Sequence, residues 1–143
     1  MKALFAVLSL LLFAFNAHAE QAKTFGDVAI HYNAMPTDEL LPEVAKNYKI
    51  ERSRNRGMLT ISILKKTSLG VSQASKGEVK VHIPLPTGQS VEVPMREIVE
   101  GAAIYYIGEY RVTAPQTLKF VVNAKPEGGD KPLSFDFSRQ FFK

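Results

Sequence analysis

Apolar and polar residues alternate at every second position in several short stretches of this chain, which is the spacing of a β-strand with one buried face. In residues 58–64, for example, Leu59, Ile61 and Ile63 share one face of the predicted strand. Seven stretches are predicted as strands, at residues 25–33, 58–64, 78–85, 90–95, 102–112, 117–123 and 133–142. Short strands that follow one another at regular intervals predict an all-β fold, an antiparallel β-sandwich of about seven strands.

One short helix is predicted after the first strand. Residues 37–48 contain apolar residues at helical spacing, and Thr37 or Asp38 can cap the beginning of such a helix. Residues 71–77 are predicted as a loop, residues 96–101 are predicted to contain a turn, and residues 126–132 are predicted as a turn-rich connection with a positive φ at Gly128 or Gly129.

The stretches 78–85 and 90–95 are predicted to form a hairpin, because the segment 86–89 between them contains a proline and a glycine. Pro84 and Pro94 indicate that both strands lie near an edge of a sheet, since proline cannot donate a hydrogen bond to a neighbouring strand.

The stretch 102–112 is the most apolar strand after the amino-terminal region, and we expect it to lie centrally, covered on much of both faces. One core is predicted, consisting of Leu59, Ile61, Ile63, Ile104, Tyr106, Leu118, Phe120, Phe135 and Phe137.

The amino-terminal residues have the pattern of an export signal. A lysine is followed by an almost uninterrupted apolar run at 4–15, and residues 17–19 (Ala-His-Ala) fit a signal peptidase site before Glu20. The run is too short to span a bilayer, which needs roughly 20 apolar residues. The sequence therefore predicts a cleaved signal peptide at 1–19 and a single exported domain at 20–143, in the periplasm of a bacterium.

The chain contains no cysteine and carries a formal net charge of +4. Without cysteine there is no lipid-modified residue after the signal, no disulfide and no thiolate chemistry, so we expect a soluble mature protein that is stabilised by packing alone. The modest positive charge is compatible with an anionic partner, and nucleic acid is not expected in that compartment.

Arg52, Arg54 and Arg56 form the one local concentration of like charge and are the candidate partner-binding residues. If this run is extended, alternate spacing places all three side chains on one side, where guanidinium groups can bind carboxylate or phosphate. The alternative is a solvated guard that prevents strand edges from aggregating, with Glu43 or Glu51 as ion-pair partners.

Five residues could supply soft ligands to copper: His31, His82, Met35, Met58 and Met95. They do not occur at HxH, HxxM or MxxM spacing, so neither a metal site nor a cofactor is predicted. The sequence also lacks GxSxG, HExxH and glycine-rich phosphate-loop motifs, and we expect no enzymatic activity.

Four segments together resemble a family of small exported proteobacterial proteins catalogued as a domain of unknown function: FGDVAIHYNAM, PEVAKNYKIERSRNRGMLTISIL, AIYYIGEYRV and FSRQFF. The resemblance covers nearly all of the mature chain. It implies a periplasmic location and an immunoglobulin-like sandwich, and it brings no catalytic residue, ligand or cofactor.

The predicted function is that of a non-enzymatic periplasmic binding or interaction module of unknown partner. The alternative is a small-ligand or metal-binding accessory protein. Its ligand would occupy a pocket between the sheets, lined by the methionines together with Tyr105, Tyr106 and Tyr110.

Overall fold

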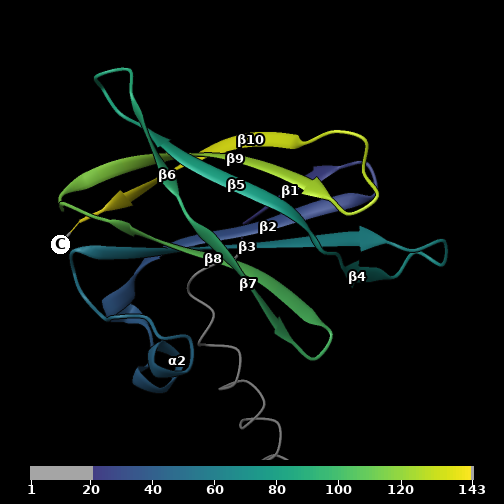
Figure 1. The fold of residues 1–143 in the computed structure, drawn as a ribbon, viewed down its shortest axis with the longest axis horizontal. Helices are drawn as coiled ribbons and strands as arrows, with labels where there is room; N and C mark the ends of the chain where they lie inside the picture. Colours follow the sequence, from purple (N-terminus) through teal and green to yellow (C-terminus); the bar gives the residue numbers. More distant parts are fainter. Residues whose placement is uncertain (1–20, 143) are drawn as a thin grey trace, which may run out of the picture.

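The computed structural model describes residues 21–142, so the predicted signal peptide (1–19) and its cleavage point before Glu20 lie outside the described residues. Within residues 21–142 the chain forms ten strands in two antiparallel sheets that pack face to face (Figure 1). This architecture confirms the predicted all-β sandwich, with ten strands in place of about seven.

The larger sheet, sheet A, has the order β1 (Gln21–Phe25), β2 (Val28–Pro36), β3 (Arg56–Lys66), β8 (Ala103–Arg111) and β7 (Met95–Glu100), and β4 (Ser72–Ala74) also pairs with β3. The smaller sheet, sheet B, has the order β10 (Leu133–Phe141), β9 (Gln116–Pro126), β5 (Gly77–Pro84) and β6 (Ser90–Val93). The predicted hairpin is confirmed as β5 and β6. Strand β6 is an edge strand, whereas β5 lies between β9 and β6 and holds Pro84 at its last position.

The chain crosses from sheet B to sheet A at Pro94. The predicted strand 90–95 ends at Val93, and a new strand, β7, begins at Met95 and pairs with β8. Residues 96–101, predicted to contain a turn, are strand up to Glu100, and the turn lies at Gly101 and Ala102, where Gly101 has a φ of +56°. Proline has no N–H to donate, and this absence costs least where the chain leaves one ladder for another.

The region predicted as one first strand contains a hairpin. Strands β1 and β2 meet at a turn in which Gly26 has a φ of +59°, so the strand predicted at 25–33 begins instead at Val28 and continues to Pro36. The short helix accordingly follows the second strand. The loop predicted at 71–77 contains β4, which pairs with the end of β3.

The helical region consists of a single 3-10 turn, η2 (Thr37–Glu39), and one short helix, α2 (Pro42–Asn47). Neither has a side-chain cap, so the predicted cap is wrong. The hydroxyl of buried Thr37 instead donates to the carbonyl of Glu51 (2.8 Å) and accepts from the N–H of Ser53 (2.9 Å). No helix within residues 21–142 has the length and apolar content needed to cross a bilayer.

Residues 37–50, the covering segment, close the outer face of sheet A. Leu40 and Ile50 of this segment pack against Met58 of β3 and Ile107 of β8 in a second, smaller apolar cluster. Strand β8 is thus interior to its sheet and apolar on both faces, as predicted.

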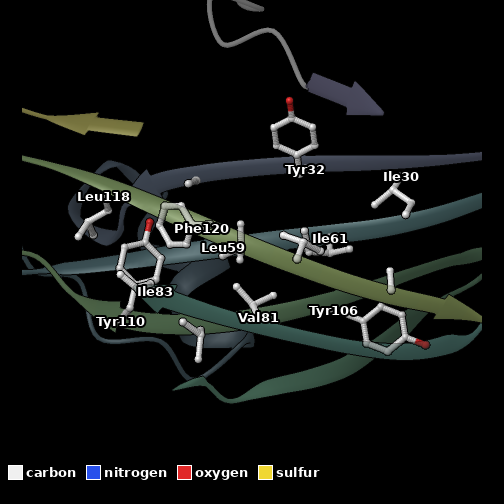
Figure 2. Close-up of a cluster of buried hydrophobic side chains, with 14 of the residues drawn as sticks. Ile30, Tyr32, Leu59, Ile61, Val81, Ile83, Tyr106, Tyr110, Leu118 and Phe120 are labelled. Carbon is white, nitrogen blue, oxygen red and sulfur yellow. The ribbon is translucent and has the colours of Figure 1, made fainter. Parts of the chain in front are cut away.

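The main core lies between the two sheets, where side chains of β3 meet those of β5 and β9 (Figure 2). Six of the nine predicted core residues are buried there, and Ile104, Phe135 and Phe137 are partly buried and pack against them. The predicted core is therefore confirmed: Leu59, Ile61, Ile63, Tyr106, Leu118 and Phe120 are its buried members.

Candidate functional site

The arginine run lies where the covering segment returns to β3. The run is not extended, because the chain turns at residues 54–55 and the N–H of Arg56 donates to the carbonyl of Ser53 (3.4 Å). The three arginines therefore do not form the single row that an extended run would give.

Arg52 and Arg54 both contact Asp38 in the 3-10 turn. Arg52 donates through Nη2 to the Asp38 carbonyl (2.8 Å), and Nε of Arg54 lies 3.9 Å from Oδ2 of Asp38. The side chain of Arg54 is 81% exposed, so this ion pair is weak. The predicted partners Glu43 and Glu51 are replaced by Asp38, which the turn brings next to the run.

Arg56 is the first residue of β3, and its Nη2 donates to Oε1 of Glu109 on β8 (3.1 Å). Directly opposite Arg56 on the β3–β8 ladder lies Arg111, an exposed residue at the end of β8. Two like charges in this position repel each other. Sequence reasoning missed Arg111 because nothing in the pattern indicates that β3 and β8 are neighbours.

A groove of about 480 Å³ lies beside this arginine pair. Nε of Arg56 is buried and has no hydrogen-bond partner within residues 21–142. A group with two anionic oxygens, such as a carboxylate or a phosphate, matches paired guanidinium donors. The groove is lined by Asn55, Arg56, Arg111, Val112, Thr113 and Ala114.

Sheet B contributes a further arginine to the same end of the sandwich. Arg139 occupies an inward-facing position of β10, between Phe137 and Phe141, and its Nε is buried without a hydrogen-bond partner among the described residues. Burial raises the pKa of the nearby Tyr110 phenol, and the positive charge of Arg139 partly opposes that effect. The arginine end is defined by five of the six arginines in the sequence: Arg52, Arg54, Arg56, Arg111 and Arg139.

The two candidate copper-binding histidines lie on opposite faces of the molecule. His31 lies between inward-facing Ile30 and Tyr32 of β2, and it lines a groove on the outer face of sheet A. His82 lies between inward-facing Val81 and Ile83 of β5, and therefore faces outward from sheet B. One ion cannot contact both.

The candidate methionines are likewise dispersed. Met35 and Met58 are directly opposite each other on β2 and β3, under the covering segment, whereas Met95 packs over Gly108 against the main core. Among residues 21–142 no group of three or more histidine, cysteine, aspartate or glutamate residues is placed to hold a metal ion.

The three tyrosines proposed to line one pocket do not share a face. Tyr106 and Tyr110 are buried in the main core, whereas Tyr105 packs against the smaller cluster on the outer face of sheet A. The hydroxyl of Tyr106 accepts from the N–H of Gly77 (2.9 Å) and donates to Glu97 (3.0 Å). Burial raises the pKa of Tyr106, so this phenol is a structural hydrogen-bonding group at neutral pH.

Fold and site together define a small all-β sandwich domain with a cationic end. The chain belongs to the DUF4426 family, a domain of unknown function whose model matches residues 22–143. A crystal structure of a DUF4426 family protein from Pseudomonas aeruginosa is similar, with a TM-score of 0.71 and 25% identity over 86% of this chain and 94% of that chain.

Two structures of FetP from uropathogenic Escherichia coli share the fold. FetP expressed in the periplasm has a TM-score of 0.59 and 11% identity, over 87% of this chain and 94% of that chain. A copper-bound FetP variant has a TM-score of 0.59 and 11% identity, over 86% of this chain and 95% of that chain. The comparison with curated proteins gives no match.

Proposed function

We propose that this protein is a non-enzymatic binding module of the bacterial periplasm that holds an anionic group of a partner at the arginine end. The observation that carries the proposal is the direct pairing of Arg56 with Arg111 beside a groove. Glu109 is the one carboxylate that forms an ion pair with either of them within residues 21–142. A carboxylate or phosphate in the groove would relieve the remaining repulsion.

Edge protection explains this pair of arginines less well than the binding of an anionic group does. Strand β3 lies between β2 and β8, and β8 lies between β3 and β7. Their ladders to β2 and β7 end at Gly57 and Gly108, so unpaired backbone groups near Arg56 and Arg111 are confined to the ends of these two strands. A guard against sheet-to-sheet aggregation is needed where backbone groups are unpaired, which is the case at edge strands.

The periplasmic location is supported by the predicted signal peptide and by the family resemblance.

The test removes two exposed arginines and leaves Arg56, whose ion pair with Glu109 is part of the fold. The double variant Arg54→Gln with Arg111→Gln is compared with the wild type and with a charge-matched control, Lys23→Gln with Lys46→Gln. Each protein is used to recover partners from periplasmic extract. We expect one partner to be recovered by wild type and control and lost from the arginine variant, with an unchanged melting temperature. Equal recovery by all three proteins would contradict the proposal.

A second candidate function is that of a metal- or small-ligand-binding accessory protein, and the likeness to copper-bound FetP is the observation that favours it. At 11% identity this likeness shows the fold alone. The soft side chains of this chain are dispersed and do not fit a shared copper site. A thermal-shift screen against copper, zinc and sulfur metabolites tests this candidate. A ligand at a hundred times its dissociation constant adds about 2.7 kcal/mol of stability.

A further inference from the structure

The β3–β4 hairpin presents apolar side chains to solvent at the end of the sandwich opposite the arginines. Its turn is well formed: the N–H of Thr67 donates to Val71 (2.8 Å), the N–H of Gly70 donates to Thr67 (2.9 Å), and Gly70 has a φ of +77°. Leu69 is 88% exposed and Val71 is 57% exposed. In Figure 1 this hairpin reaches beyond the ends of the neighbouring strands, at the far right.

Three lysines lie directly behind this tip. Lys65, Lys66 and Lys76 line a groove of about 600 Å³ together with one carboxylate, that of Glu127. Nζ of Lys76 lies 3.6 Å from a carboxylate oxygen of Glu97. Lys65 and Lys66 make no ion pair within the part of the chain that the structure describes. Two ammonium groups that have no ion-pair partner among residues 21–142 therefore lie beside an exposed apolar tip.

We propose that this hairpin tip docks on an anionic lipid membrane. Leu69 and Val71 would enter the boundary between headgroups and acyl chains, and the ammonium groups of Lys65 and Lys66 would contact the lipid phosphates. The two features complement the two layers of such a surface, because a membrane offers apolar chains beneath a layer of negative charge. This inference is independent of the proposed function at the arginine end.

The molecule contains its own control for this proposal. The β5–β6 hairpin also exposes two aliphatic side chains, Leu85 (37%) and Val91 (47%), but the segment 84–92 contains no lysine. An exposed aliphatic pair alone is common on protein surfaces. The combination with lysine distinguishes the β3–β4 tip.

The experiment is sedimentation of the mature protein with vesicles of phosphatidylcholine alone or mixed equally with phosphatidylglycerol. We expect binding to the mixed vesicles and much weaker binding to phosphatidylcholine. Leu69→Ser with Val71→Ser should weaken binding about tenfold or more. Lys65→Gln with Lys66→Gln should have a similar effect. The control Leu85→Ser with Val91→Ser should bind as the wild type does.

Three results would overturn the proposal. One is the absence of binding to the mixed vesicles. Another is equal binding by all the variants, which would place the contact elsewhere. The third is loss in the lysine variant with no effect of the Leu69 and Val71 changes, which would reduce the interaction to general charge attraction. Circular dichroism of each variant verifies that these surface changes leave the fold intact.

Discussion

At the scale of single residues, the packing of Tyr110 is the most demanding feature of the core. Gly57 lies directly opposite it on the neighbouring strand, and a Cβ at that position would approach Cε2 of the Tyr110 ring to 2.2 Å. The ring is held from other sides by Phe120 (4.9 Å between centroids) and Phe141 (5.9 Å). The Tyr110 hydroxyl has no hydrogen-bond partner within residues 21–142. The sequence therefore requires glycine at position 57 for a reason that only packing reveals.

The first prediction is that Tyr110→Phe leaves the free energy of unfolding at neutral pH unchanged or higher, because it removes a buried donor without a partner. Burial raises the pKa of Tyr110 in the folded state, so ionisation above the unfolded value of about 10 favours the unfolded chain. Wild-type stability should accordingly fall above pH 10, by about 1.4 kcal/mol per pH unit from this group. Above pH 10 the free energy of unfolding of the Tyr110→Phe variant should therefore fall less steeply than that of the wild type, by about 1.4 kcal/mol per pH unit.

Urea denaturation at pH 9 and pH 11 measures this difference. Tyr48 and Tyr106 also have raised pKa values and remain in both proteins, so the comparison isolates Tyr110. The prediction fails if the phenylalanine variant is less stable at neutral pH, which would mean that the hydroxyl forms a stabilising hydrogen bond.

At the scale of elements, the covering segment is the part of the fold that converts an exposed sheet face into a second apolar cluster. Its helix has only six residues and no side-chain cap, and a helix this short is not stable alone. The residue that follows the helix, Tyr48, forms two hydrogen bonds with β7: Arg96 donates to the carbonyl of Tyr48, and the Tyr48 hydroxyl donates to Glu100. The hydrogen bond to Glu100 raises the pKa of Tyr48. Tertiary contacts therefore hold this segment in place.

The second prediction concerns two aliphatic residues of this segment. Ile50 is 6% exposed and packs in the smaller cluster, so Ile50→Ala should cost about 2 to 5 kcal/mol of unfolding free energy. Leu41 is 64% exposed, and Leu41→Ala should stay within about 0.5 kcal/mol of the wild type. Chemical denaturation of both variants provides the comparison. Equal effects would show that the segment does not pack on sheet A as described.

At the scale of the whole molecule, one core joins the two sheets. One end of the sandwich carries a group of arginines, and the other end carries lysines beside an exposed apolar hairpin tip. Phe120 is fully buried at the centre of that core, where its ring stacks on Phe137 (5.1 Å between centroids) and meets Tyr110 edge to face. The arginine end and the lysine-flanked β3–β4 tip lie at opposite ends of β3, so one strand separates the two proposed contact surfaces.

The third prediction is that Phe120→Ala costs about 3 to 5 kcal/mol, a large part of the 5 to 15 kcal/mol expected for a domain. Phe142 is 69% exposed at the end of the chain, and Phe142→Ala should change the denaturation midpoint very little. A small effect of the Phe120 change would contradict the burial of this face of β9.

The sequence alone determined which residues face the core, since a period of two is a local property of each strand. All nine predicted core residues pack in or against the main cluster. The sequence also identified Arg52, Arg54 and Arg56 as a local concentration of positive charge. Local signals failed where the chain leaves a regular pattern: the change of sheet at Pro94, the hairpin at Gly26 and the short strand β4.

Only the tertiary structure decided which strands are neighbours. The pairing of β3 with β8 places Arg111 opposite Arg56, and the packing of β10 over sheet A adds Arg139 to the same end. The same pairing sets Tyr110 over Gly57. The physical reason is that alternation fixes the direction of a side chain relative to its own strand, whereas strand order depends on how all the apolar faces are buried together.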